Sequence, residues 1–203
     1  MRFGIDVSEH QDGLSLVRAA AEGIEFAVLR TTDGTYRDRV FASHLADARA
    51  AGLTLAAYHY LRSPAEGTSV AEQVDAAVEV LGDTDLPMWL DCETPAGLSL
   101  DDVREAHRLF TARGVEVAGI YTYKRWWRWR MLNADTREFG ALWLAAHGDD
   151  PAGPPRDTFP GGWPGPVGGQ SPELWQFSSR ASVAGFAVDV NARRVRSRGS
   201  FRG

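Results

Sequence analysis

The 203-residue sequence is poor in cysteine and lysine, with one of each at Cys92 and Lys124. A single cysteine permits neither an intramolecular disulfide nor a metal cluster held by several cysteines. The formal net charge is −5, whereas a protein that binds duplex DNA normally presents a basic face. We therefore expect no nucleic acid among the partners of this chain.

Long hydrophobic runs are also missing. No apolar stretch approaches the roughly 18 residues of a transmembrane helix, so we predict no membrane insertion. The first residues enter a strand without the charged and apolar segments of a signal peptide ahead of them. The expectation is a protein made in the cytoplasm that acts after release or lysis.

Several sequence motifs of catalysis and cofactor binding are absent. No G-x-G-x-x-G follows the first expected strand, no phosphate-binding loop is present, and no G-x-S-x-G nucleophile motif occurs. The histidines show no metal-ligand spacing; they are His10, His44, His59, His107 and His147. We expect no cofactor and no metal.

What the sequence does contain is a repeated alternation of apolar strands and helices. Strands are predicted at 3–8, 25–31, 53–61, 86–93, 115–122, 141–146, 174–177 and 186–190. Helices are predicted at 14–21, 39–51, 67–81, 99–113 and 124–131. Alternation of this kind indicates a mainly parallel sheet, and eight strands favour closure into an α/β TIM-like barrel over the alternative, an open doubly wound sheet.

The length and the 44% hydrophobic content fit a single domain. We assign residues 1–192 to this domain and 193–203 to an Arg-, Ser- and Gly-rich tail or linker. Within the domain, residues 150–172 are dense in proline and glycine, which predicts a segment without regular structure.

The fourth strand ends in two acids, Asp91 and Glu93, with Cys92 between them. Because strand side chains alternate, the acids share one face with Cα atoms roughly 7 Å apart, and Cys92 faces the other way. This separation lets two carboxyl groups act on one glycosidic bond. Acids in a surface turn or a helix cap are the simpler reading, but the C-terminal ends of barrel strands are where such folds keep their chemistry.

Two further acids, Asp6 and Asp189, end the first and last predicted strands. If the sheet closes, these strands are neighbours and the two carboxyl groups lie side by side at the rim. Either aspartate alone is explained equally well as a capping or turn residue. Four acids at one mouth would repel each other and raise at least one pKa, as a general acid requires.

Aromatic residues occupy the same predicted ends of the strands, and flat apolar rings suit the faces of sugars. The strand positions leave open which rings face a ligand and which belong to the core, and Trp89 and Trp143 are the stronger core candidates. The set comprises Tyr58, Tyr60, Trp89, Tyr121, Tyr123, Trp143 and Trp175.

Taken in order, these motifs resemble the family 25 glycoside hydrolases, lysozymes of the cellosyl type found in bacteria, fungi and phages. The resemblance covers about Phe3 to Asn191. It is carried by the runs Asp6-Val7-Ser8-Glu9-His10-Gln11, Tyr58-His59-Tyr60, Asp91-Cys92-Glu93, Ile120-Tyr121-Thr122, Leu142-Trp143-Leu144-Ala145, Leu174-Trp175-Gln176-Phe177-Ser178 and Val188-Asp189-Val190-Asn191.

The resemblance implies an irregular barrel of eight strands and five helices. It makes Glu93 the general acid and Asp91 its partner carboxylate, with Asp6 and Asp189 lining the pocket. The implied substrate-binding residues are Tyr58, Tyr121, Trp143, Gln176 and His147. Two residues depart from the family pattern: His147 stands where a tyrosine is usual, and Asp33 where a glutamate is common.

The function implied by the resemblance is endo-acting hydrolysis of the β-1,4 bond between N-acetylmuramic acid and N-acetylglucosamine in peptidoglycan. We expect a monomer, and a phage endolysin or its catalytic module is one setting for it. We expect a substrate-assisted route over a covalent intermediate on Asp91; in that route an ionised Asp91 beside a protonated Glu93 orients and stabilises the developing oxazolinium ring. The alternatives are a barrel that binds wall glycan without cutting it, or a barrel hydrolase of another glycan such as chitin.

Overall fold

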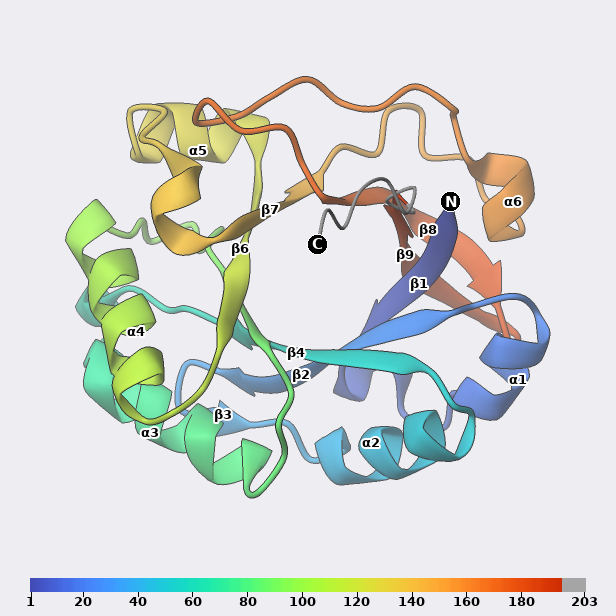
Figure 1. Cartoon of the computed structure of the whole chain (residues 1–203), viewed down its shortest axis with the longest axis horizontal. Coiled ribbons are helices and arrows are strands. Elements are labelled where there is room, and N and C mark those ends of the chain that lie inside the picture. The colour runs from blue at the N-terminus through green and yellow to red at the C-terminus, as the bar shows by residue number, and fades with distance from the viewer. Residues whose placement is uncertain (195–203) are drawn as a thin grey trace, which may run out of the picture.

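The computed structural model describes residues 1–194 and shows a closed barrel surrounded by helices (Figure 1). The barrel strands follow the order β1-β9-β8-β7-β6-β5-β4-β2, and pairing of β1 with β2 closes the ring. The strands are β1 Arg2–Val7, β2 Phe26–Asp33, β4 Thr54–Tyr60, β5 Met88–Asp91, β6 Val117–Tyr123, β7 Ala141–Ala145, β8 Leu174–Val183 and β9 Phe186–Arg193. A two-residue strand, β3 Tyr36–Arg37, extends the sheet beyond β2. The predicted TIM-like α/β barrel is confirmed.

Six α-helices accompany the strands within the described part of the chain. They are α1 Leu16–Ala21, α2 Phe41–Ala50, α3 Val70–Leu81, α4 Leu100–Ala112, α5 Lys124–Arg130 and α6 Pro155–Thr158. Five of them were predicted, and none of the helices in residues 1–194 is long and apolar enough to cross a membrane. Serine side chains begin α3 and α4 with capping boxes, Ser69 with Glu72 and Ser99 with Asp102.

The barrel is irregular because its last two strands form a long hairpin. β9 runs antiparallel to both β8 and β1, whereas the other neighbours in the ring are parallel. The predicted strands 174–177 and 186–190 were too short, because register shifts around Ser178 interrupt the alternation along β8. Ala184 and Gly185 close the hairpin, both with positive φ.

The C-terminal boundary also differs slightly from the prediction. Arg193 is the last residue of β9 and pairs with Arg2 on one side and Leu174 on the other. It therefore belongs to the barrel. Arg194 follows the strand without regular structure, and the predicted tail from residue 195 on lies outside the described residues.

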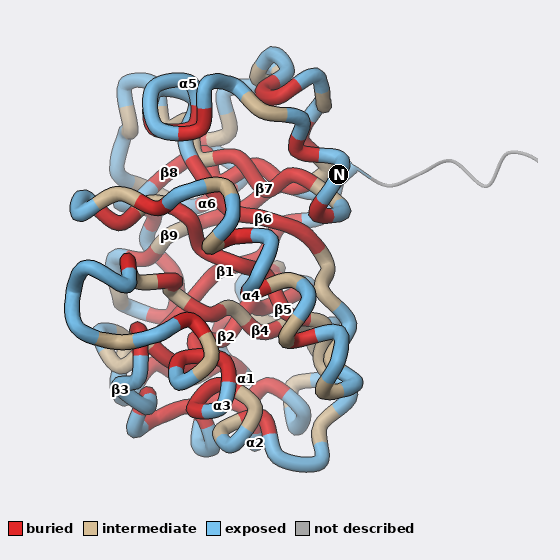
Figure 2. The backbone as a smooth tube through the Cα atoms, turned by 90° about the vertical axis from the view of Figure 1, so that its left-hand side faces the viewer, coloured by how far each residue is buried: buried red, intermediate tan, exposed pale blue. Residues whose placement is uncertain are grey.

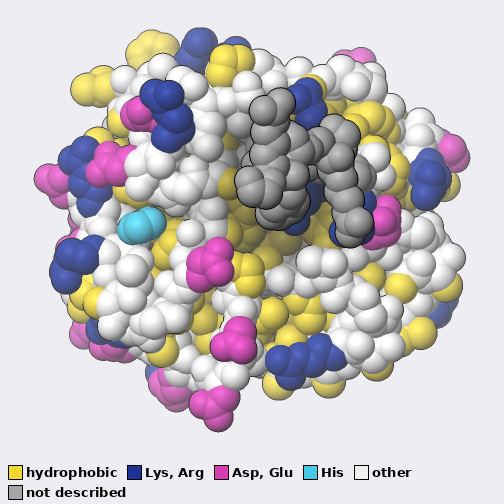
Figure 3. Space-filling view, in the orientation of Figure 1, with side chains coloured by type: hydrophobic (Ala, Val, Ile, Leu, Met, Phe, Trp, Pro, Cys, Tyr) yellow, Lys and Arg dark blue, Asp and Glu magenta, His cyan; other side chains and the backbone are white. Residues whose placement is uncertain are grey.

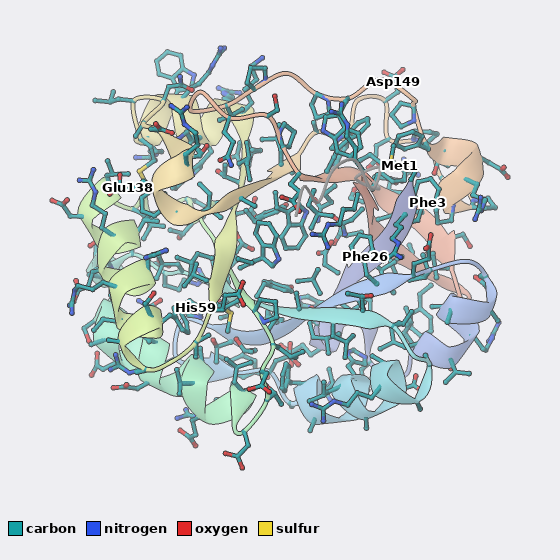
Figure 4. All side chains as sticks on the ribbon, viewed as in Figure 1. Met1, Phe3, Phe26, His59, Glu138 and Asp149 are labelled. Carbon is teal, nitrogen blue, oxygen red and sulfur yellow. The ribbon has the colours of Figure 1, made fainter. Side chains whose placement is uncertain are left out.

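The core has two parts. A large cluster fills the space between the strands and the helices, and a smaller one fills the barrel interior. Figure 2 shows that most of the backbone along the barrel strands is buried. Phe26 lies in the interior cluster. His59 lies on the outer side of the barrel and packs against Phe110 of α4 (both Phe26 and His59 are labelled in Figure 4). Burial lowers the pKa of His59 to about 4, so it is a neutral core residue at ordinary pH.

The Pro/Gly-rich segment 150–172 is attached to the outside of the barrel by aromatic rings. Phe159 lies 5.5 Å from Phe3 and 5.2 Å from Phe177, measured between ring centroids, and Trp163 lies 5.4 Å from Trp175. Apart from the single turn of α6, the segment has no helix or extended strand, close to what its composition predicted. Trp175 therefore faces this segment and not the mouth of the barrel, which corrects its assignment to the rim.

Candidate active site

A cavity of about 550 Å³ opens at the end of the barrel where the parallel strands finish. All nine predicted site residues line it: Asp6, Tyr58, Asp91, Glu93, Tyr121, Trp143, His147, Gln176 and Asp189. The other lining residues are Arg30, Tyr60, Tyr123 and Ala145. Trp89 does not line this cavity. It lines a second cavity, at the other end of the barrel, so it is not a site residue. The predicted constellation is thus brought together, and the roles of its members remain predictions.

β5 delivers the central pair of acids. Asp91 is its last residue and is buried, and Glu93 follows two residues later, half-buried. Between them, Cys92 is fully buried in the outer core, and its backbone N–H donates to the Tyr121 carbonyl. The chain therefore keeps its alternation past the end of the strand, and both carboxyl groups face the cavity.

Asp6 and Asp189 meet across the seam where the two ends of the chain pair. Asp6 on β1 is the direct partner of Asp189 on the antiparallel strand β9. Asp189 was predicted to end its strand, but β9 continues to Arg193 and runs in the opposite direction. It still reaches the same rim because, in an antiparallel pair, residues near the start of one strand lie opposite the end of the other.

A chain of hydrogen bonds holds Asp6 in place. Its Oδ2 accepts from Gln176 Nε2 at 3.0 Å and from Asn191 Nδ2 at 2.7 Å. The Asn191 oxygen accepts in turn from Trp143 Nε1 at 2.7 Å. Asn191 was not among the predicted site residues, although it lies in the last run of the family resemblance.

The amide oxygen of Gln176 continues this network on the other side. It accepts from the Tyr121 hydroxyl at 2.9 Å and lies 2.8 Å from His147 Nε2. Because this oxygen can only accept, His147 carries a hydrogen on Nε2 in this arrangement. The network thus joins two of the predicted substrate-binding residues, Tyr121 and His147, to the amide of a third, Gln176.

The four carboxyl groups raise one another's pKa. Burial and then Asp189 raise the pKa of Asp6 to about 8, and burial, Glu93 and Asp150 raise that of Asp189 to about 7. Burial and then Asp6 raise the pKa of Glu93 to about 6. Since ordinary carboxyl groups titrate near pH 4, the site holds protons under conditions in which surface acids hold none.

Asp91 differs from an ordinary aspartate in the free protein. Burial, followed by the charges of Glu93, Asp6 and Asp33, raises its pKa well above the ordinary range. Its Oδ1 is buried without a hydrogen-bond donor among residues 1–194. Carboxylates are stabilised by donated hydrogen bonds, so an oxygen without one favours the protonated form. The sequence could not reveal this local lack of donors.

Arg30 is the charged residue of the site that the sequence interpretation missed. It lies in β2, lines the cavity, and donates to Asp38 at 2.8 Å and Glu9 at 3.1 Å. Its positive charge lowers the pKa of Asp91 against the stronger effect of burial. The sequence did contain an indication of this residue: Arg30 is the one basic residue in an otherwise apolar predicted strand. A charged side chain that is buried in this way needs a partner of opposite charge.

Asp33, one of the two departures from the family pattern, does not line the cavity. It accepts from the Arg62 guanidinium, with Nη2 at 2.8 Å from Oδ2.

In residues 1–194, no group of three or more His, Cys, Asp or Glu side chains is arranged to hold a metal ion.

Comparisons with known proteins agree with this geometry. Residues 5–186 match the family described as Glycosyl hydrolases family 25. The chain is 29% identical to Lysozyme M1 of Streptomyces globisporus over 93% of its own length, and it spans 65% of that relative. It is 29% identical to the autolytic lysozyme of Clostridium acetobutylicum, of which it spans 45%. The bacterial lysozyme structure from Streptomyces coelicolor superimposes with a TM-score of 0.78 at 26% identity, covering 98% of this chain and 93% of that one.

Proposed function

The chain belongs to family 25 of the glycosyl hydrolases, and on this basis we propose that it is a lysozyme that cuts peptidoglycan. The bond cleaved is the β-1,4 linkage between N-acetylmuramic acid and N-acetylglucosamine, within the glycan strand. The protein acts on the bacterial cell wall as a monomer, and an endolysin is one setting for it. The relatives named lysozymes support the substrate class.

The observation that carries this proposal is the pair of carboxyl groups at the end of β5, facing one cavity. Glu93 is half-buried with a pKa of about 6, so at mildly acid pH it holds a proton while remaining open to a ligand. These are the properties of a general acid that protonates the leaving oxygen of a glycosidic bond.

Asp91 has the complementary role. In the substrate-assisted route, the N-acetyl carbonyl of the cleaved sugar attacks its own anomeric carbon. The amide N–H of that group can donate to Asp91 Oδ1, the buried oxygen without a donor among residues 1–194. Such a hydrogen bond lowers the pKa of Asp91, and the positive charge that develops on the ring lowers it further. Asp91 thus gives up its proton to solvent as the substrate binds, the charge developing on the ring then stabilises the ionised form further, and the positive charge of Arg30 assists.

The surrounding residues hold the sugar and the acids. Tyr58, Tyr121 and Trp143 present aromatic surface to the cavity, and the Tyr121 and Trp143 rings meet edge to face at 4.6 Å. Asp6 and Asp189 tune the central pair by charge, since Asp6 raises the pKa of Glu93. We prefer this route to a covalent intermediate on Asp91, and both retain the anomeric configuration. Inversion, detected by NMR of fresh product, would contradict both.

The test of the proposed activity is the identity of the sugar at the new reducing end. Purified cell walls are digested, the ends are reduced with borohydride, and the reduced sugar is identified after hydrolysis. Reduced muramic acid is the expected product. Reduced glucosamine would exclude muramidase activity, digestion of chitin alone would favour the other-glycan alternative, and binding without any new ends would favour the non-catalytic barrel.

A further inference from the structure

Helix α5 carries a basic and aromatic surface on a protein whose net charge is negative. We call the exposed residues Lys124, Arg125, Arg128, Trp129 and Leu132 the α5 surface. Residues 123–134 include four basic side chains and no acidic one, although the chain carries a net charge of −5. Figure 3 shows hydrophobic and basic side chains close together over the position that α5 occupies in Figure 1.

Helix α5 has large apolar side chains on its exposed side as well as on its buried side. Trp126 and Trp127 lie on its buried side, whereas Trp129 is 77% exposed. Leu132, just after the helix, is 88% exposed and has φ of +49°, a left-handed conformation that costs energy for a side chain with a Cβ. Two large apolar side chains are therefore held in solvent, where folding gains nothing from them.

The positive charges of this surface are not neutralised within the described part of the chain. Lys124, Arg125 and Arg128 have no carboxylate within ion-pair distance among residues 1–194, whereas nearby Arg104 and Arg137 pair with Glu138 and Asp135. Guanidinium groups bind carboxylates through two parallel hydrogen bonds, and exposed indole rings stack on flat ligands. The α5 surface is complementary to a partner that carries several carboxylates.

This surface adjoins the candidate active site. Tyr123, which lines the cavity and is 38% exposed, directly precedes α5. From the helix, Trp126 Nε1 donates to the Thr94 carbonyl at 3.2 Å and Arg130 donates to the Pro95 carbonyl at 3.1 Å. The helix is thus fixed to the loop that follows Glu93. A polymer that extends from the cavity past Tyr123 would reach the α5 surface.

We propose that the α5 surface binds the carboxylate-bearing peptides of the same peptidoglycan strand whose glycan occupies the cavity. This inference rests on the proposed function, because it takes the occupant of the cavity to be that strand. Arg125 and Arg128 pair with peptide carboxylates, and Trp129 and Leu132 cover the apolar parts of the peptide.

An anionic membrane is the other partner with suitable charge, and the structure favours it less. Two protruding side chains offer less apolar area than a single acyl chain, which by itself anchors a protein only marginally. The attachment of α5 to the loop after Glu93 instead points to the substrate of the neighbouring site.

The test compares two charge-reversed proteins, each also carrying Glu93→Gln so that binding is measured without cleavage. One carries Arg125→Glu and Arg128→Glu. The control carries Arg49→Glu and Arg108→Glu, which change the net charge equally on exposed positions of α2 and α4. Binding is measured by co-sedimentation with purified peptidoglycan freed of phosphate polymers, with glycan strands freed of peptides, and with anionic phospholipid vesicles. Thermal unfolding verifies that both variants are folded.

The α5 variant is expected to bind peptide-bearing peptidoglycan about five- to tenfold more weakly than the control, and peptide-free glycan equally well. Equal loss in both variants, or no loss, would overturn the proposal. So would an equal loss on peptide-free glycan, or a loss confined to vesicles. Because these readouts are binding ratios, they remain informative even if wild-type protein releases no reduced muramic acid, the result that would refute the proposed function itself.

Discussion

Asp6 on β1 and Asp189 on β9 are direct partners across two antiparallel strands, although they stand near opposite ends of the chain. Their pairing joins the two ends of the barrel beside the central acids. Each carboxyl group raises the cost of ionising its neighbours, since Asp189 raises the pKa of Asp6 and Glu93 raises that of Asp189. The site therefore concentrates charge that a fold selected only for stability would separate.

Asp189→Asn should stabilise the protein at alkaline pH. The pKa of Asp189 is raised to about 7, so the folded state holds a proton that the unfolded state has lost, and Asp189 weakens stability as the pH rises from about 4 to about 7. The variant should gain about 1–2 kcal/mol in the free energy of unfolding at pH 8 and little at pH 4.

Urea unfolding at both pH values measures this difference. Asp83→Asn, at an exposed loop position, controls for the loss of one negative charge. An Asp189→Asn protein that is less stable than wild type at pH 8 would show that the like-charge cost is not the dominant effect.

The alkaline limit of activity should lie at or above about pH 6. A general acid works only while protonated, the pKa of Glu93 is already raised to about 6 in the free protein, and an ionised Asp91 in the complex raises it further. Positive charge on His147 lowers the pKa of Glu93, so His147→Gln should move this limit upward. The pH dependence of kcat for both proteins measures the shift. A limit near pH 4.5, or one that His147→Gln lowers, would contradict the electrostatic account.

Arg30→Leu should destabilise the fold by about 3–5 kcal/mol, because it leaves the buried Asp38 carboxylate without its cation. Arg37→Leu removes a solvent-exposed pair with Glu79 and should change the free energy of unfolding by less than about 1 kcal/mol. Chemical denaturation of the two variants provides the comparison. Equal small losses would mean that the Arg30 pair contributes little to the fold.

The sequence predicted the barrel and the meeting of its acids because both follow from periodic patterns. Alternation along β5 placed Asp91 and Glu93 on one face and Cys92 on the other, and the structure agrees. It could not predict the reversed direction of β9, because Asp189 gives the same pattern in a strand of either direction. Nor could it predict the partners of Arg30, since Asp38 lies in a loop and Glu9 in a short 3-10 helix, and the positions of both relative to β2 depend on the whole fold.

The position of the Trp175 ring could not be predicted from the sequence either. Its strand position suited the rim, but its ring lies against Phe159 and Trp163 of the Pro/Gly-rich segment. A segment without periodicity carries no signal for where it packs, so the face that it covers appears only in three dimensions.

The most direct test of the central claim is the rate of peptidoglycan cleavage by Glu93→Gln. Glutamine keeps the shape of the side chain but cannot donate the acid proton, so cleavage should fall by about 10²–10⁴-fold while binding to cell walls and thermal stability are retained. The release of new reducing ends from purified walls measures the rate, and co-sedimentation measures binding. A folded Glu93→Gln protein with near-wild-type cleavage would refute the assignment of Glu93 as the general acid.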